Sequence, residues 1–166
     1  MADRAINGVG ARVVVTASAD ETRALARHLA GAAAPGDVIA LRGELGAGKT
    51  QFAKGFAAGL GVRAVVNSPS FTLMAEYAGR IPLFHLDLFR LAGTGDALAG
   101  GLIDERQQQG VSLIEWADRL EGPIGRSDLE VSFRGAGEEP REISLIPRTT
   151  GGRRYLQALA TGSAGR

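Results

Sequence analysis

The sequence is organised around residues 43–50, which read Gly43-Glu44-Leu45-Gly46-Ala47-Gly48-Lys49-Thr50. This stretch is a complete G-x-x-x-x-G-K-T motif, the phosphate-binding loop (P-loop) of nucleoside triphosphatases. The apolar run at residues 38–41 precedes it and predicts a short buried strand. Phenylalanine and leucine recur at helical spacing after it. The motif is therefore expected between a strand and a helix, which is where its chemistry requires it.

Each part of this loop has an expected task. The glycines let backbone N–H groups approach phosphate oxygens, and the helix that follows directs the positive end of its dipole at them. Lys49 is expected to reach the β- and γ-phosphates, and the Thr50 hydroxyl is expected to ligate Mg²⁺. The motif therefore predicts that the chain binds a nucleoside triphosphate.

Length and composition are typical of one soluble domain. The chain has 166 residues, of which 45% are hydrophobic and 22% charged, with a formal net charge of +1. No basic cluster stands out, so strong direct nucleic-acid binding is not expected. The lack of cysteine excludes disulfides, thiolate catalysis and Cys-ligated zinc. No apolar run approaches membrane-spanning length and no signal-peptide core is present, which predicts a cytoplasmic protein.

Hydrophobic patterning predicts one domain with strands and helices in alternation. Residues 1–11 are expected to form a flexible arm, 12–160 a single P-loop domain and 161–166 a flexible tail. Strands are predicted at 12–16, 38–41, 73–77, 81–88, 111–115, 129–134 and 141–146. Helices are predicted at about 20–32, from the P-loop to 59–61, at 96–99, at 102–109 and from 152 onward. Strands 73–77 and 81–88, and strands 129–134 and 141–146, should form antiparallel hairpins, because short turns join them.

Two predicted strands end in a carboxylate. Glu115 ends the apolar run 111–115, which is the layout of a Walker-B element that delivers an acid to the metal, although a strand-end acid exposed to solvent is the alternative. Asp87 ends the strand at 81–88 and either holds water near the metal or caps the next turn. His85 shares a strand face with Asp87 and is expected to be a core histidine. Trp116 either packs over the site or belongs to the core.

Hydroxyl groups occur at two further places near the expected site. Residues 68–72 lie at the distance past the P-loop where many related proteins keep a γ-phosphate-sensing switch, although an ordinary turn fits the pattern equally well. Ser18 and Glu21 form a capping box for the first helix, and contact with the nucleotide is the less favoured interpretation.

Four sequence blocks together resemble one family. In order they are GELGAGKT, SPSFTL, HLDLFRL and IEWADRL, and with them about residues 37–120 resemble the TsaE (YjeE) family. The resemblance implies an α/β fold of the P-loop NTPase type, a three-layer sandwich with a mixed central sheet, antiparallel hairpins and helices on both faces. It also implies a Mg²⁺-dependent ATPase, slow alone, that assists threonylcarbamoyl modification of adenosine 37 in tRNA with the partner proteins TsaB and TsaD.

The same resemblance implies roles for individual residues. Thr50 and Glu115 would ligate Mg²⁺, Asp87 would be needed for hydrolysis, and residues 68–72 would be the switch. The implied catalytic residues are Asp87, Lys49 and Glu115. The implied ATP-binding residues are Glu44, Leu45, Gly46, Ala47, Gly48, Lys49, Thr50, Gln51, Ser70 and Arg141. Gln51 and Ser70 both stand where the family often has threonine. Ser70 keeps the hydroxyl, whereas Gln51 changes the chemistry near the α-phosphate. The region 20–21 and Arg141 resemble positions near the base and ribose.

Two other functions use a P-loop in a chain of this length. A small-molecule or nucleoside kinase usually has an arginine-rich lid. The only arginine in residues 91–110 is Arg106, which speaks against a lid there. A GTP-binding switch module reads guanine with an Asn-Lys-x-Asp motif, which the sequence lacks. An arginine finger for hydrolysis would come from Arg90 or from a partner.

Overall fold

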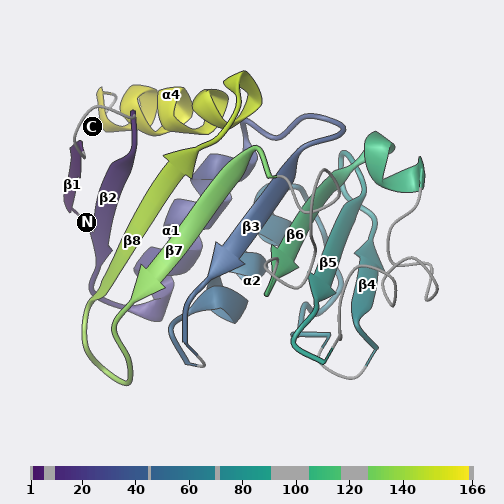
Figure 1. The fold of residues 1–166 in the computed structure, drawn as a ribbon, viewed down its shortest axis with the longest axis horizontal. Coiled ribbons are helices and arrows are strands. Elements are labelled where there is room, and N and C mark those ends of the chain that lie inside the picture. The colour runs from purple at the N-terminus through teal and green to yellow at the C-terminus, as the bar shows by residue number, and fades with distance from the viewer. Residues whose placement is uncertain are drawn as a thin grey trace.

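The computed structural model describes residues 2–5, 10–44, 46–69, 72–90, 105–116 and 127–164. Within these residues, eight strands form one mixed sheet in the order β1-β2-β8-β7-β3-β6-β5-β4 (Figure 1). The strands are β1 (Ala2–Ala5), β2 (Arg12–Thr16), β3 (Val38–Arg42), β4 (Met74–Tyr77), β5 (Leu83–Asp87), β6 (Val111–Glu115), β7 (Leu129–Arg134) and β8 (Arg141–Pro147). The helices are α1 (Ala19–Ala30), α2 (Lys49–Gly59), the 3₁₀ helix η1 (Glu105–Gln109) and α4 (Thr150–Ala164).

The centre of the sheet is parallel and its borders are antiparallel. Strand β3 pairs in parallel with β6 and β7, and β5 pairs in parallel with β6. The hairpins β4–β5 and β7–β8 are antiparallel, as their sequence pattern predicted. Because β3, β5 and β6 run in the same direction, their carboxyl ends share one edge of the sheet. This edge carries the P-loop, Asp87 and Glu115, and it is where open α/β sheets bind ligands.

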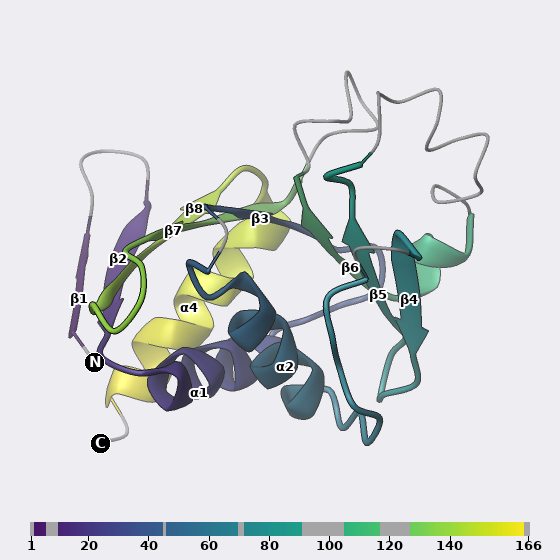
Figure 2. The same ribbon diagram turned by 90° about the horizontal axis from the view of Figure 1, so that it is seen from below.

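The three described α-helices cover one face of the sheet, as Figure 2 shows for α1, α2 and α4. Side chains from alternate positions of β3 face opposite sides: Ile39 and Leu41 join the core under the helices, and Ala40 joins a second cluster on the other side. The α/β fold with a mixed sheet is confirmed. Helices were expected on both faces, but within the described residues the α-helices form a single layer.

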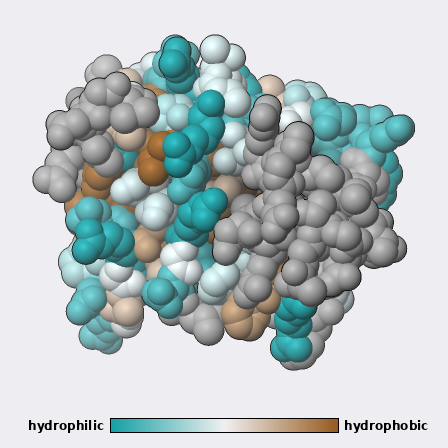
Figure 3. Space-filling view, in the orientation of Figure 1, coloured by the Kyte–Doolittle hydropathy of each residue, from teal (hydrophilic) through white to brown (hydrophobic). Residues whose placement is uncertain are grey.

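The sheet is most completely buried at β5 and β6, between the P-loop strand β3 and the β4 edge. All residues of β5 and β6 are buried, whereas β7 and β8 alternate buried with half-buried residues over most of their length. Figure 3 shows the face opposite the helices, where hydrophilic side chains are mixed with small hydrophobic areas on the half carrying β2, β7 and β8. Strands β5 and β6 pair in parallel and are buried on both faces, whereas β8, which is antiparallel to both of its neighbours, is half-buried on one face.

Helix α2, which begins at the P-loop, packs unusually closely on α1. A Cβ atom added to Gly55 would lie 2.2 Å from the Arg23 carbonyl oxygen, and one added to Gly59 would lie 2.5 Å from that of Arg27. These two glycines therefore let the helix backbones approach more closely than any side chain would allow. The contact therefore holds α2, which begins at the P-loop, against α1.

Helix α4 is tied to the start of the P-loop strand by a buried polar network. Tyr155 Oη and Arg154 Nη2 each donate a hydrogen bond of 2.6 Å to Asp37, one residue before β3. Burial, together with the neighbouring Asp37 carboxylate, raises the pKa of Tyr155 well above its usual value. The phenol therefore stays protonated and remains a donor.

The ends of the chain contain more secondary structure than the sequence pattern predicted. Residues 2–5 were expected in a flexible arm, but they form β1, which pairs with β2 through partners such as Ala2 and Val15. The last helix was expected to be short and to end before a flexible tail at 161–166, whereas α4 continues to Ala164. The helix predicted at 96–99 lies outside the described residues, and of the one predicted at 102–109 the structure describes η1.

Candidate nucleotide site

The P-loop connects β3 to α2, so the predicted strand–loop–helix arrangement is confirmed. Gly48 caps the N-terminus of α2 with a φ of 106°, a left-handed conformation that only glycine adopts without strain. Gly43 has a φ of 152°, and an added Cβ there would lie 3.0 Å from the Phe133 Cβ. Helix α2 begins at Lys49, so its free N–H groups face the loop. Leu45 lies outside the described residues.

Lys49 folds back across the loop and is buried. Its Nζ donates a hydrogen bond of 2.6 Å to the Gly43 carbonyl oxygen and lies 4.6 Å from the centre of the Trp116 ring. Trp116 has a left-handed φ of 60°, and its ring lies tilted against that of Phe89, which is 49% exposed, with 4.9 Å between the ring centres. Trp116 thus packs beside the P-loop lysine and also against the hydrophobic cluster that includes Phe84 and Ile114, so both roles considered for it are observed. Lys49 and Trp116 border a hollow of about 200 Å³ beside the loop.

The two strand-end carboxylates lie side by side, both buried. Asp87 and Glu115 are directly paired in the register of β5 and β6. The Ser68 hydroxyl donates to Asp87 Oδ2 at 3.0 Å and lies 3.5 Å from Glu115 Oε2. Asp87 also accepts a hydrogen bond from the Phe89 N–H, so it caps the following turn as well. The structure thus brings together one serine of the segment 68–72 and both predicted acids.

His85 belongs to the same cluster, which the sequence did not indicate. The imidazole is fully buried, and its Nε2 lies 2.9 Å from Glu115 Oε2. Its Nδ1 has no hydrogen-bond partner among the described residues. His85 was expected to be an ordinary core histidine; it is a core residue, but one that holds a site carboxylate. Only the pairing of β5 with β6 brings the two side chains together.

The oxygen-rich cluster fits Mg²⁺. No group of three or more acidic or histidine side chains that could hold a metal occurs in the described part of the chain. Mg²⁺ does not require such a group, because it keeps several waters and usually binds one or two carboxylates together with substrate phosphates. Two adjacent buried carboxylates repel one another, and a divalent cation would relieve that repulsion. Thr50, in the first turn of α2, would supply a further oxygen.

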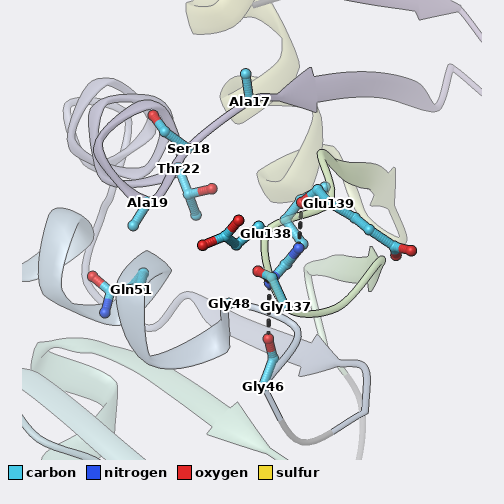
Figure 4. Close-up of a pocket in the computed structure, with 11 residues that line it drawn as sticks. Ala17, Ser18, Ala19, Thr22, Gly46, Gly48, Gln51, Gly137, Glu138 and Glu139 are labelled. Atoms are coloured by element: carbon cyan, nitrogen blue, oxygen red, sulfur yellow. Dashed lines mark hydrogen bonds between the residues drawn. The ribbon is translucent and has the colours of Figure 1, made fainter.

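A second pocket of about 350 Å³ opens on the other side of the P-loop (Figure 4). Its walls are the start of α1 with Ser18 and Thr22, the P-loop with α2, and the turn between β7 and β8. Figure 4 shows the Glu138 side chain directed from that turn toward the α1 side of the pocket. No local sequence pattern indicated this turn as part of a site, because only the folding of the β7–β8 hairpin brings it to the P-loop.

Three predicted site residues around this pocket take part in other contacts. The Ser18 hydroxyl accepts from the Glu21 N–H at 3.1 Å, so it caps α1 as predicted and also lines the pocket. Gln51 accepts a hydrogen bond of 2.5 Å from Arg23 Nη1 and links α2 to α1. The Arg141 guanidinium is bonded to backbone carbonyls of the P-loop and of the β7–β8 turn.

The other predicted residues lie at the edges of the site or beyond the described residues. Glu44 is exposed in the P-loop, and Arg90, the candidate arginine finger, is exposed in the turn after β5. Ser70 and the segment 91–104 lie outside the described residues. None of the described helices is both long enough and apolar enough to cross a membrane.

Known proteins resemble this chain in sequence and structure. Residues 16–143 match the family model described as threonylcarbamoyl adenosine biosynthesis protein TsaE. The chain is 44% identical over 141 residues to the tRNA threonylcarbamoyladenosine biosynthesis protein TsaE of Bacillus subtilis, covering 84% of this chain and 86% of that protein. The protein of the same name from Treponema pallidum is 40% identical over 110 residues, covering 66% and 82%. The crystal structure of Bacillus subtilis YdiB matches with a TM-score of 0.72 at 36% identity, covering 96% of this chain and 99% of that one. The chain belongs to the TsaE family.

Proposed function

We propose that this protein is a Mg²⁺-dependent ATPase that acts with TsaB and TsaD in the threonylcarbamoyl modification of adenosine 37 in tRNA. The tRNA pathway comes from the names of the family and its relatives. One observation supports the ATPase activity above all others: the P-loop lysine Lys49 and the paired buried carboxylates Asp87 and Glu115 lie at the same edge of the sheet.

The geometry gives each residue a task in hydrolysis. The N–H groups at the start of α2 would bind the phosphate oxygens, and Lys49 would leave the Gly43 carbonyl to bind the β- and γ-phosphates. Thr50 and Glu115 would hold Mg²⁺, whose charge neutralises the phosphate oxygens when it is bound. Asp87, which already accepts a hydrogen bond from Ser68, would orient the attacking water. Hydrolysis in this scheme depends on positioning and electrostatics, not on a covalent intermediate.

The second pocket is the expected place for the nucleoside. It adjoins the P-loop and has polar groups from α1 and from the β7–β8 turn. Glu138 is well placed to accept a hydrogen bond from a ribose hydroxyl or an amino group of the base (Figure 4). An arginine finger would come from Arg90 or from a partner, and we therefore expect slow hydrolysis by the protein alone.

Phosphate release from ATP tests the ATPase proposal. With Mg²⁺, the protein should release phosphate, and chelation of Mg²⁺ should stop it. Lys49→Ala should lower the rate by about 10²-fold or more, whereas Lys54→Ala, on the same helix, is the matched control and should leave it unchanged. Equal rates for Lys49→Ala and the native protein would overturn the proposal. Transfer of phosphate to a nucleoside in the same assay would instead establish a kinase, and tighter binding of GTP than ATP would favour a GTP switch.

The partnership is tested separately. The protein should be retained on immobilised TsaB–TsaD more strongly with ATP than without it, and phosphate release should rise in the presence of the pair. Absence of both binding and stimulation would refute the partnership while leaving the ATPase activity itself intact.

A further inference from the structure

Arg141 joins the two walls of the larger pocket through backbone carbonyls alone. Its Nε donates to the Ala47 carbonyl at 3.0 Å, and its Nη2 donates to that of Gly46 at 3.1 Å, both in the P-loop. From the same guanidinium, hydrogen bonds of 2.9 Å and 2.5 Å reach the carbonyls of Gly137 and Glu139 in the β7–β8 turn. Figure 4 labels Gly46 in the P-loop and Gly137 in the β7–β8 turn. Most of the N–H donors of the side chain are therefore already used by the protein.

Holding these carbonyls determines where the loop N–H groups point. In a trans peptide the C=O and N–H bonds point in opposite directions. The Gly46 carbonyl shares its peptide unit with the Ala47 N–H, and the Ala47 carbonyl shares its unit with the Gly48 N–H. Because Arg141 binds both carbonyls, both N–H groups face away from Arg141. The Ala47 N–H then donates to the Glu44 carbonyl across the loop at 3.1 Å, which closes the turn.

Arg141 adds to the other contacts of this part of the loop, which include burial of the Ala47 side chain and the hydrogen bond from the Phe52 N–H to the Gly48 carbonyl. Gly46 is exposed, has a φ of 79°, and a Cβ added there would meet nothing within 4 Å. Gly48 has a φ of 106°, and its added Cβ would first meet Arg141 Nε at 3.9 Å. Glycine peptide units rotate more freely than others, and two of them border the peptide units that Arg141 binds.

We propose that Arg141 is a positioning residue that preorganises the P-loop for phosphate binding and couples it to the β7–β8 turn. This inference rests on the proposed ATPase function and sharpens the role of Arg141, which sequence comparison suggested as a nucleotide contact. Arg141 acts through the orientation of residues 46–48. Because one guanidinium binds both walls of the pocket, it should also keep the P-loop and the β7–β8 turn in a fixed position relative to each other.

The effect on the empty protein separates this role from direct contact. A residue that only touches the nucleotide leaves the empty loop unchanged when it is replaced, whereas a residue that positions the loop does not. In Arg141→Gln, which loses the charge and the planar fork of donors, the backbone amides of Gly46, Ala47 and Gly48 should show lower ¹⁵N–¹H NOE values without nucleotide. ATP should bind about tenfold or more weakly, the scale expected for losing hydrogen bonds from a charged donor.

Two further variants complete the experiment. Arg134→Gln replaces an exposed arginine of the same hairpin and should change neither measurement. Arg141→Lys keeps the charge but not the fork, and it provides the same two readouts if Arg141→Gln does not fold. Weaker ATP binding with an unchanged empty loop would show direct contact and overturn the proposal, and so would unchanged ATP affinity. If the native protein fails to bind ATP, the proposed function fails, but a disordered loop in the Arg141 variant would still establish the positioning role.

Discussion

Replacing Gly55 with alanine tests whether the close approach of α1 and α2 is needed at the nucleotide site. The new Cβ would lie 2.2 Å from the Arg23 carbonyl oxygen and 2.6 Å from the Arg23 Cα, whereas ordinary contact begins at 3.4 Å. Both neighbouring atoms belong to the backbone of α1, so no side chain can rotate to make room. The two helices would have to move apart.

The size of the effect follows from two opposing terms. Forcing extra volume into a packed contact costs about 1–3 kcal/mol, while alanine in place of glycine stabilises a helix by about 1 kcal/mol. Because the clash is with backbone, we expect the cost to lie at the upper end and the net loss to be about 2 kcal/mol. For a domain of this size, that loss lowers Tm by about 4–8 °C.

The same movement should weaken nucleotide binding. Helix α1 carries Ser18 and Thr22 of the larger pocket, α2 carries Gln51, and Arg23 bonds Gln51 across the helix contact. Thermal unfolding followed by circular dichroism, with and without ATP, measures both effects. Ala58→Gly on the exposed side of α2 is the control, because it measures helix propensity without a clash. A Tm for Gly55→Ala equal to or above that of the native protein would refute the argument from packing.

Three further predictions follow from the site and from the α4 anchor. Trp116 is the single tryptophan of the sequence and contacts Lys49, so ATP binding should change its fluorescence, and an unchanged spectrum at saturating ATP would contradict a movement of Lys49. His85→Leu should lower the rate of Mg²⁺-dependent hydrolysis by about tenfold, because it removes the hydrogen-bond partner of the buried Glu115 carboxylate. His85→Gln should lower that rate less, and equal losses of rate in the two variants would argue against the contact with Glu115. The pKa of Tyr155 is raised in the folded protein. The unfolded chain therefore loses the Tyr155 proton at a lower pH than the folded protein does, and the free energy of unfolding should fall above about pH 10. Tyr155→Phe should lower stability at neutral pH by about 1–3 kcal/mol and flatten the decline above pH 10 in urea denaturation curves, and an identical slope would contradict the assignment.

The features predicted correctly from the sequence are those determined by local pattern. The P-loop, the strand before it and the helix after it follow from one motif and its flanking apolar residues. The common edge for Asp87 and Glu115 follows from two buried strands that each end in a carboxylate, provided that the strands run parallel. In both cases the information lies within a few residues of the site.

What could not be predicted depends on contacts between distant segments. The bond between His85 and Glu115 requires the register of β5 on β6, and a shift of one residue would turn His85 to the other face. The Arg141 bridge requires the β7–β8 hairpin to fold over the P-loop, which nothing in the local pattern of either segment indicates. Strand β1 was not predicted because residues 2–5 have no alternating pattern, and in the structure they pair with β2.

The contacts of Lys49 show how the loop remains ready for a triphosphate. Among the described residues, its ammonium group contacts the Gly43 carbonyl and the Trp116 ring. A hydrogen bond from a charged donor contributes about 1.5–3 kcal/mol, and a cation–π contact contributes about 0.5–2 kcal/mol. Both groups are uncharged, whereas the β- and γ-phosphates of ATP would offer a full negative charge in a largely buried site, where charge pairs are stronger than in water. Exchange of the neutral partners for phosphate is therefore favourable. Burying the Lys49 ammonium without these neutral partners would cost more free energy than either contact contributes.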